Sequence, residues 1–402
     1  MIKVLWHEEV RRRRERCGIS QKELSQASGI SSRYLRKLEA GEASPTQEML
    51  QRIEDGFECL KAEAALTMVI DYFRVRFPVQ DVRYVIEDIL KIKLQYMLHQ
   101  DMGFYGYNQS YVLGNIFVYY TDVDDGTNKG VLLELKGKGC RQYESYLSAQ
   151  GRTWYDFMRC CYNVDARFKR VDLAINDHKG ILDVSELIEK CRNEECVSFF
   201  RTFRDHNSGK LIRSHEQNKE EMGKTLYIGS MRSEIYFCIY EKDYEQFIKA
   251  RVSMEDAPIK NRFELRLSDD RAKNAVYDLL CFEDPERTVF GIINYYVRFI
   301  DRVAGKEHSK CPVNKKWERF VGGEDRGKLK LTMAPEPYTI DRTLKWLGHQ
   351  VMPMLIMASE IDEKNGTSYI HDMVKNTELK KRHRKIIEQC TVPVNDAVRS
   401  GW

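Results

Sequence analysis

The spacing of apolar residues in the first 57 residues of this 402-residue chain predicts short helices. We expect a first helix over Glu8–Arg16, which ends before Gly18, and a second that begins at the capping box Ser20–Glu23. A third helix, Ser31–Glu39, follows a tight turn at Gly29. Two short helices joined by a glycine turn predict a helix-turn-helix module.

A different pattern follows this module. Alternating apolar and polar positions, separated by turn residues, predict strands over much of residues 68–300, and helical periodicity interrupts them. We therefore expect a mostly antiparallel sheet with helices, which is an α+β domain. The expected strands are Met68–Phe77, Tyr105–Val112, Ile116–Thr121, Gly130–Lys136, Lys169–Asn176, Ser198–Asp205, Lys224–Gly229, Ile235–Lys242 and Arg262–Leu267, and the expected helices are Val79–Lys91, Gln142–Leu147, Thr153–Cys161 and Asp183–Arg192.

The C-terminal region mixes helical and polar segments. Phe282–Val303 is apolar enough to form a helix, whereas Gly305–Gly327 is polar and basic and is expected to be a linker or a DNA-contacting loop. Thr339–Met357 is again helical, and Pro353 should kink or end that helix. Asp372–Gln389 is predicted to be one basic helix.

These patterns predict a multidomain chain. We expect an all-α helix-turn-helix domain over residues 1–60, an α+β domain over residues 68–300 and a basic helical region over residues 301–402. Hydrophobic residues are 42% of the chain, with 24 Gly and 9 Pro, so a disordered or collagen-like chain is excluded. No run approaches the ~20 apolar residues of a membrane-spanning helix, and the N-terminus lacks the apolar core of a signal peptide. The 11 cysteines are scattered, with no C-x-x-C pair, which favours reduced thiols and a cytoplasmic protein.

The N-terminal module carries candidate DNA contacts. The segment Ile19–Gly41 resembles the Cro/CI class of phage-repressor helix-turn-helix motifs. The resemblance implies that Ser31–Lys37 lies in the major groove of duplex DNA, and the arginine run just before it favours the same partner. A helical interaction module that binds no DNA is the alternative. The groove-facing residues would be Ser32, Arg33, Arg36 and Lys37.

Three of the expected strands combine an apolar face with charged or tyrosine side chains on the other face. These faces either are ordinary solvated surface or gather into a shared site. The alternation puts the following residues on the polar faces: Arg170, Asp172 and Asn176; Tyr236, Tyr240 and Lys242; and Arg262, Glu264 and Arg266.

A shared site built from these residues would suit phosphoryl transfer. Asp172 and Glu264 are hard oxygen ligands for Mg²⁺ or Mn²⁺, and such an ion stabilises charge on a reacting phosphate. A tyrosine can be the nucleophile if a nearby cation or metal lowers its pKa, and Lys242 lies two residues from Tyr240 on the same face. The sequence has no P-loop, no G-x-S-x-G elbow and no H-x-H or H-E-x-x-H motif, so other common enzyme classes fit less well.

An ordered set of motifs over residues 68–300 resembles the Rep_trans family. Its members are rolling-circle replication initiators of Gram-positive plasmids and the MobT-type relaxases of integrative and conjugative elements. The added helix-turn-helix module is similar to the MobT relaxases rather than to the plasmid initiators. The motifs are Asp71–Phe77, Gly137–Glu144, Arg170–Ile175, Tyr227–Ser230 with Arg232-Ser233, Tyr236–Lys242 with Glu245, and Arg262–Arg266.

The resemblance implies site residues by motif position. Tyr240 would be the nucleophile, with Tyr236 in reserve and Lys242 beside it. Asp172 and Glu264 would hold a divalent metal, Mg²⁺ or Mn²⁺, and Asp177 is a third candidate ligand because Asn176 stands where relatives would have an acidic residue. Arg141 and Arg170 would hold DNA phosphates, although Arg141 could equally brace Glu144.

The function implied is that of a DNA relaxase, which nicks one strand at an origin of transfer and stays attached through a phosphotyrosine bond. The alternatives are a rolling-circle replication initiator of a plasmid or phage, and a non-enzymatic helix-turn-helix transcription regulator. The expected partners are double-stranded and single-stranded DNA, with a coupling protein and a second copy of the chain as further candidates. The C-terminal region would then serve packing or dimerisation, or recognise the origin.

Overall fold

The chain divides into two compact units, each made of two stretches of sequence. In the computed structural model, the first unit comprises Met1–Val75 and Arg167–Ala334, and the second comprises Arg76–Ala166 and Pro335–Trp402. This division differs from the predicted order of three consecutive segments. The structure describes residues 10–11, 13–14, 19–43, 45–46, 49–50, 52–54, 56–57, 65–122, 129–209, 221–250, 253, 257–322, 329, 331–336, 338, 344 and 347–399.

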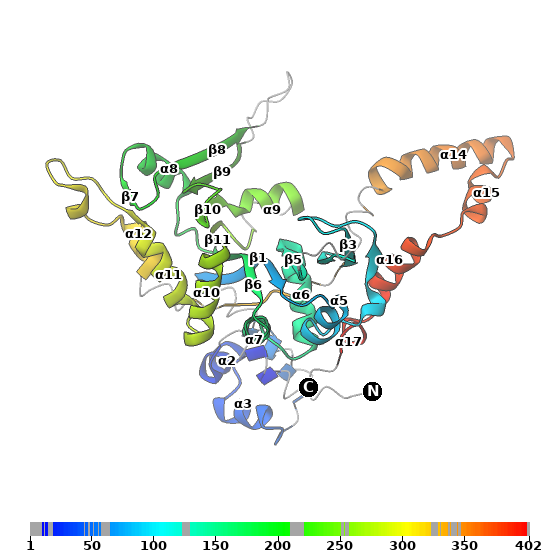
Figure 1. Cartoon of the computed structure of the whole chain (residues 1–402), viewed down its shortest axis with the longest axis horizontal. Helices are drawn as coiled ribbons and strands as arrows, with labels where there is room; N and C mark the ends of the chain where they lie inside the picture. The colour runs from blue at the N-terminus through cyan, green and yellow to red at the C-terminus, as the bar shows by residue number, and fades with distance from the viewer. Residues whose placement is uncertain are drawn as a thin grey trace. The chain divides into compact units, whose positions relative to one another are not determined.

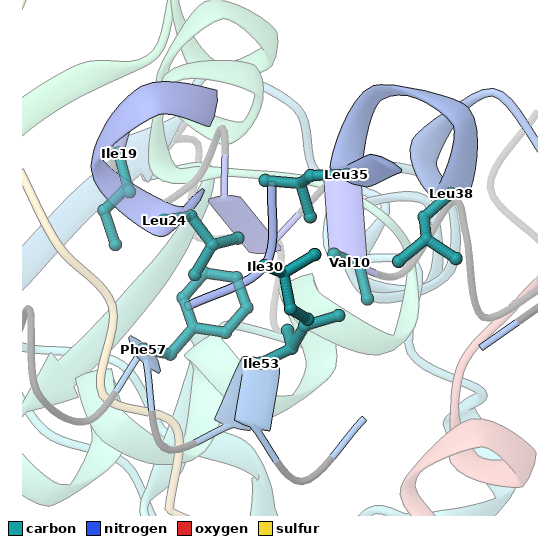
Figure 2. Close-up of a cluster of buried hydrophobic side chains, with 8 residues drawn as sticks. All are labelled: Val10, Ile19, Leu24, Ile30, Leu35, Leu38, Ile53 and Phe57. Carbon is teal, nitrogen blue, oxygen red and sulfur yellow. The ribbon is translucent and has the colours of Figure 1, made fainter. Parts of the chain in front are cut away.

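The helix-turn-helix begins the first unit and has its own apolar core. Its helices α2 (Gln21–Ser28) and α3 (Ser32–Glu39) are joined by a turn in which Gly29 has a φ of 65°. The predicted capping box is present, because the Glu23 amide donates to Ser20 Oγ and the Ser20 amide donates to the Glu23 carboxylate. Figure 2 shows the eight core side chains gathered together: Val10, Ile19, Leu24, Ile30, Leu35, Leu38, Ile53 and Phe57.

Six strands of the first unit form a sheet in the order β1-β6-β11-β10-β9-β8 (Figure 1). The pairs β6/β11, β11/β10, β10/β9 and β9/β8 are antiparallel, as the sequence predicts. The chain therefore returns to the middle of the sheet after long excursions. The strands are β1 (Leu66–Phe77), β6 (Arg167–Asp177), β8 (Phe203–Gly209), β9 (Glu221–Ile228), β10 (Ile235–Glu241) and β11 (Asn261–Ser268).

Helices and a small second sheet complete this unit. Helix α10 packs along β6 and β11, and α11 contacts both α10 and α12. The buried rings of Phe237, Phe263, Trp317 and Phe320 form part of the core between these elements. The remaining elements are α8 (Val184–Arg192), α9 (Lys242–Ala250), α10 (Asp269–Phe282), α11 (Pro285–Tyr296), η3 (His308–Lys310) and α12 (Lys315–Gly322), with the antiparallel pair β7 (Cys196–Ser198) and β12 (Val297–Phe299).

The second unit holds an antiparallel sheet in the order β2-β3-β4-β5, together with helices from both of its stretches. Buried Tyr143, Trp154 and Phe157 pack edge to face between α6 and α7. The elements are α5 (Val82–Tyr84), the π-helical turn η1 (Val85–Ile89), η2 (Leu94–Tyr96), β2 (Leu98–Gln100), β3 (Gln109–Leu113), β4 (Ile116–Tyr120), β5 (Val131–Lys136), α6 (Gly137–Ala149), α7 (Trp154–Asn163), η5 (Leu347–Val351), α14 (Met352–Asn365), α15 (Tyr369–Asn376), α16 (Lys381–Thr391) and α17 (Val394–Ala397).

Several segments differ from the predictions. The expected strand Ser198–Asp205 is interrupted between the end of β7 and the start of β8. The expected loop Gly305–Gly327 contains η3 and α12, because buried Trp317 and Phe320 give α12 an apolar face. The expected helix Phe282–Val303 ends in β12, and the expected tail helix breaks between α15 and α16. The start of the expected strand Tyr105–Val112 is a turn instead, in which Tyr105 and Gly106 both have positive φ.

The nine cysteines within the described residues are free thiols, in agreement with the prediction. Among the helices that the structure describes, none combines the length and apolar character needed to cross a membrane.

The core of the helix-turn-helix gives a direct stability prediction. Replacing fully buried Leu35 by alanine should destabilise the module by about 2–5 kcal/mol, because a cavity replaces packed methyl groups. Amide hydrogen exchange in α2 and α3 of the full chain should then accelerate strongly. Arg33→Ala is the control, since Arg33 is exposed on the same helix. Equal exchange in both variants would mean that the module does not depend on this core.

Candidate functional site

Strands β6, β11 and β10 place polar side chains on one face of the sheet. Every second residue points to this face, and the antiparallel register aligns these residues into rows. We call this set the polar face. Its rows are Tyr236, Arg266 and Asp172; Cys238, Glu264 and Ala174; and Tyr240, Arg262 and Asn176. Strands β9 and β8 extend the second row with Tyr227 and Arg204, and the third with Thr225 and His206.

The opposite face of the same strands is apolar and buried. Phe263, for example, contacts the rings of Trp317 and Phe320 of α12 at centroid distances of 6.1 and 5.6 Å. The strands therefore derive their packing from this face, which leaves the polar face available for chemistry. The buried apolar residues are Leu173, Ile175, Phe237, Ile239, Phe263 and Leu265.

The hydroxyl group of Tyr240 lies between a carboxylate and an ammonium group. It donates a hydrogen bond to Glu264 Oε1 at 2.9 Å, and Lys242 Nζ donates to the Tyr240 oxygen at 3.3 Å. Lys242 also forms an ion pair with Glu245, one turn further along α9. Tyr240 thus has both a proton acceptor and a cation at its oxygen, which are the groups that a tyrosine nucleophile needs.

Burial sets the protonation state of this group. It raises the pKa of Tyr240 well above 10, and the negative charge of Glu264 raises it further. Burial also lowers the pKa of Lys242 from 10.5, as does the nearby Arg262, while Glu245 opposes that shift. In the protein alone Tyr240 is therefore a neutral phenol, and additional positive charge would be needed to make it a phenolate.

Guanidinium groups hold both acidic residues of the polar face. Arg170 donates to both oxygens of Asp172, at 2.8 and 2.6 Å. Arg266 donates twice to Glu264 Oε2, at 2.9 and 2.7 Å, and its Nε lies 3.9 Å from Asp172. Arg266 therefore bridges the two carboxylates, and the geometry fixes the direction in which each carboxylate points.

The surroundings of Asp172 raise the pKa of its carboxyl group. Burial raises this pKa from 3.8 to about 6, and the negative charge of Glu264 adds to the increase. The hydrogen bond and charge of Arg170 and the charge of Arg266 act in the opposite direction. The carboxyl group is therefore protonated below about pH 6 and ionised above it, so cation binding by Asp172 should weaken on acidification.

The third row of the polar face contains a buried arginine with a distant partner. Arg262 donates from Nε to Asn176 Oδ1 at 2.8 Å and from a terminal nitrogen to Asp71 of β1 at 2.9 Å. Asn176 also donates to Thr67, at 3.4 Å. Asn176 therefore acts in a structural network that joins β1, β6 and β11.

Asp177, the predicted third ligand, does not join Asp172 and Glu264. Its side chain is fully buried, one residue out of phase with the polar face. The carboxylate accepts hydrogen bonds from the backbone amides of Lys179 and Leu182, at 3.2 and 2.9 Å, and from Asn261 at 3.1 Å. It therefore holds the turn that follows β6.

The two candidate tyrosines share the polar face but have different neighbours. Tyr236 is 9% exposed, and its oxygen accepts a hydrogen bond of 3.4 Å from Arg266. The guanidinium carbon of Arg266 lies 5.6 Å from the centre of the Tyr236 ring. Tyr236 thus has a cation beside it, whereas Tyr240 has both a carboxylate and a cation.

The donor chemistry of Asp172 and Glu264 fits a hard divalent cation. Mg²⁺ is commonly held by one or two carboxylates together with water and substrate phosphate oxygens, so the two carboxylates are donors of the type that this ion accepts. Among the residues that the structure describes, no three His, Cys, Asp or Glu side chains are grouped to hold a metal ion. A cation would have to compete with Arg170 and Arg266 for the carboxylate oxygens.

Several residues of this network were not predicted as site residues, namely Asp71, Glu245, Arg262 and Arg266. The alternation with Glu264 in one strand places Arg262 and Arg266 on this face, but it gives them no role in the site. Glu245 is one helical turn from Lys242, which is also a local signal. The role of Asp71 depends on pairing with a residue 191 positions away, which has no local signal.

The predicted groove-facing residues of the helix-turn-helix lie at the surface of α3. Arg33, Arg36 and Lys37 are exposed on α3 and Ser32 is partly exposed, while Leu35 and Leu38 of the same helix are buried. Within the described residues, the three basic side chains form no ion pair or hydrogen bond, so their charges are available to an external anion.

The two predicted phosphate-binding arginines have acidic partners. Arg141 of α6 pairs with fully buried Glu144 at 2.8 Å, and Glu144 also accepts a hydrogen bond of 2.8 Å from Trp154. Arg141 therefore braces Glu144, which is the alternative to phosphate binding that the sequence left open. Arg170 pairs with Asp172 on the polar face, and its guanidinium lies 4.3 Å from the centre of the Tyr72 ring.

Three family models match the chain. The model of the replication initiation factor family matches residues 166–374. The model of the N-terminal domain of rolling-circle replication initiation proteins matches residues 67–160, and a helix-turn-helix model matches residues 10–61. The three matches follow one another along the chain with short gaps.

Two similar proteins extend these matches. A candidate DNA relaxase of Bacillus subtilis (strain 168), named NicK, is 38% identical over 338 residues, which cover 84% of this chain and 93% of that protein. The structure of a rolling-circle replication initiator protein from Geobacillus stearothermophilus aligns with a TM-score of 0.56 and 26% identity, and covers 67% of this chain and 100% of that one.

The raised pKa of Asp172 gives a prediction about metal binding. In the metal-free protein this carboxyl group should titrate near pH 6, and its midpoint should fall when Mg²⁺ is added, because a bound cation favours the ionised form. NMR of the aspartate side-chain carboxyl carbons measures the midpoint, with Asp172→Asn to assign the signal. A midpoint that Mg²⁺ leaves in place would count against this carboxylate as a ligand.

Proposed function

The chain belongs to the replication initiation factor family, and we propose that it is a relaxase that nicks one DNA strand at an origin of transfer through Tyr240. The observation that carries the proposal is the position of the Tyr240 oxygen, 2.9 Å from Glu264 and 3.3 Å from Lys242, on the same face as Asp172. The similarity to NicK over most of both chains supports transfer as the setting of this chemistry.

The proposed reaction starts with proton transfer from the Tyr240 hydroxyl group to Glu264. The phenolate oxygen then forms a bond to the phosphorus of the scissile phosphodiester, while the bond from that phosphorus to one sugar oxygen breaks. The leaving sugar oxygen takes up a proton from water, Glu264 releases its proton to solvent, and the other DNA end stays linked to Tyr240. Because one phosphoester replaces another, the linkage keeps the energy that rejoining needs.

Each neighbour of Tyr240 has a distinct part in this reaction. Glu264 accepts the proton, and the two hydrogen bonds from Arg266 keep its other oxygen in place. Lys242 stabilises the negative charge that develops on the phenolate. Asp172 is the residue that would hold Mg²⁺ or Mn²⁺ while Glu264 acts as the base, and such an ion, when bound, polarises the scissile phosphate.

The high pKa of Tyr240 fits a regulated nucleophile. Burial and Glu264 keep the hydroxyl group protonated in the free protein. The positive charge that arrives with the cation would offset this effect, so activation would coincide with assembly of the DNA complex.

A rolling-circle replication initiator is the second candidate function. It is favoured by the full coverage of the Geobacillus stearothermophilus initiator by this chain. The same nicking chemistry would serve both functions, and only the DNA site would differ. A transcription regulator without enzymatic activity would not need the hydrogen-bonded arrangement of Tyr240, Glu264 and Lys242.

The C-terminal helices α14 and α15 support a proposal about protein partners. Met354, Ile356, Met373 and Val374 are each more than half exposed on them. Side chains of this kind, and methionine in particular, are common at surfaces that bind other proteins. A second copy of the chain and a coupling protein are the partners that we propose for transfer.

Tyr240→Phe should abolish nicking and leave DNA binding unchanged. The substitution removes one oxygen and its hydrogen bonds, while the ring keeps its packing. The test is incubation with a labelled origin oligonucleotide and Mn²⁺, followed by a denaturing gel that detects the covalent adduct. Tyr236→Phe is the matched control on the same strand and should form the adduct. The opposite pattern would make Tyr236 the nucleophile.

The helix-turn-helix should contribute to binding of duplex DNA but not to cleavage. Arg33→Ala or Lys37→Ala should weaken duplex binding by about 1–3 kcal/mol if the residue reads a base, and should reduce the dependence on salt if it contacts a phosphate. Lys364→Ala, an exposed lysine of α14, is the control. Cleavage of a single-stranded oligonucleotide should stay at the wild-type rate.

This prediction separates the module from the catalytic face. Duplex binding is measured across a salt series for the wild type and the three variants. If the Arg33 and Lys37 variants match the Lys364 control in both affinity and slope, the module binds a protein instead of DNA.

A further inference from the structure

Two aromatic rings lie stacked on the surface of the first unit, outside the polar face. Phe199 follows β7 and is 70% exposed, and Tyr295 lies near the end of α11 and is 63% exposed. Their ring centroids are 5.0 Å apart, and their planes differ by 19°. We call this pair the aromatic platform. Leaving two large rings in water is unfavourable, so the exposure points to a ligand that covers them.

The aromatic platform is held in place by the core beneath it. A second stack, Phe200 on Tyr296, has a centroid distance of 4.9 Å, and Phe200 also contacts buried Phe237 at 5.2 Å. The Phe199 amide donates to the Tyr296 carbonyl at 3.0 Å. The platform is therefore fixed before any ligand binds, which lowers the entropy lost on binding.

The aromatic platform adjoins one end of the polar face. Gly229, at the end of β9, has a φ of 95°, and its amide donates to the Thr202 carbonyl at 2.8 Å. A Cβ at Gly229 would lie 2.8 Å from the Phe200 ring and 3.2 Å from Tyr236 Cβ. The segment that carries the platform therefore touches the strand at Tyr236. Tyr240 follows four residues later, roughly 13 Å further at ~3.3 Å per residue.

Three arginines lie on or beside β8 and β9, the strands next to the segment that carries the aromatic platform. Arg201, Arg204 and Arg232 are all exposed, and their side chains have no ion pair or hydrogen bond with any residue that the structure describes. Arg204 also extends the second row of the polar face, through its pairing with Tyr227. Tyr296 also lines a pocket of about 320 Å³ whose charged lining residues are Arg271, Arg287 and Asp278.

We propose that the aromatic platform stacks an unpaired base of single-stranded DNA, and that the three arginines bind the phosphates around this base. The inference rests on the proposed function, because the strand would be the one that crosses the polar face for nicking. Stacked aromatic side chains beside basic residues bind single-stranded nucleic acid with little sequence preference. The platform would hold the strand a few nucleotides from the scissile bond, on the Tyr236 side.

The test measures binding alone, so it does not depend on cleavage. Fluorescent single-stranded origin oligonucleotides are titrated into the full-length Tyr240→Phe protein without a divalent metal. Phe199→Ala and Tyr295→Ala, made in this background, should each weaken binding on the order of tenfold. Phe199→Trp should preserve it, because the ring is kept. Tyr369→Ala is the matched control, since Tyr369 is 65% exposed on α15.

A scan with abasic sites locates the contact. An oligonucleotide that lacks one base but keeps its phosphates should bind more weakly at one or two positions on one side of the nick. Phe199→Ala should make binding insensitive to an abasic site at those positions and leave the others unchanged. Arg201→Ala should instead reduce the salt slope by about 0.7, the contribution of one phosphate on a single strand.

The outcomes are distinct. Equal affinities for Phe199→Ala, Tyr295→Ala and the Tyr369 control, or the same abasic profile in the parent and variant proteins, would overturn the proposal and leave a protein partner as the ligand. If the wild type never forms a covalent adduct but the abasic scan depends on Phe199, the proposed nicking function fails and the platform stands.

Discussion

The alternation of side chains along β6, β10 and β11 is the constraint on which both the fold and the site depend. One set of alternate residues packs against helices, and each fully buried Leu, Ile or Phe there contributes roughly 1.5–3 kcal/mol. The other set bears Asp172, Glu264, Tyr240 and three arginines. Charges at such positions are costly to desolvate, and bidentate pairing with guanidinium groups offsets that cost. The apolar face therefore allows a charged face to exist in the middle of a sheet.

The same pairing determines the chemistry of the site. Each carboxylate of the polar face is paired with an arginine in the protein alone, so a cation would have to displace that arginine. Burial holds the pKa of Asp172 near 6 and that of Tyr240 well above its ordinary value. An incoming phosphate is an alternative partner for the guanidinium groups, because they bind phosphate with the same forked geometry as carboxylate. Under the proposed function, DNA binding would loosen the internal pairs and make the carboxylates available to a cation.

Much of this arrangement could be predicted from the sequence, because it follows from local periodicity. A period of two residues put Asp172, Glu264 and Tyr240 on polar faces, and the capping box at Ser20–Glu23 marked the start of α2. The same period of two residues argues against Asp177 as a ligand beside Asp172. The two residues are an odd number of positions apart, so their side chains point to opposite faces. Asp71 could not be found in this way, since its pairing with Arg262 depends on which strands become neighbours. The helix α12 was missed because two buried rings in a polar segment are a weak signal.

The basic side chains of the protein fall into two groups, those that are paired with a carboxylate and those that are not. Only a cation without an internal partner gains fully from displacing counterions on DNA. Arg33, Arg36 and Lys37 on α3 and Arg201 and Arg232 near the platform are in this state among the described residues, whereas Arg170, Arg262 and Arg266 are paired with carboxylates. The unpaired cations would supply affinity that depends on salt. The paired ones position acidic groups around Tyr240, so under the proposed function affinity and catalysis would rest on different residues and could be altered separately.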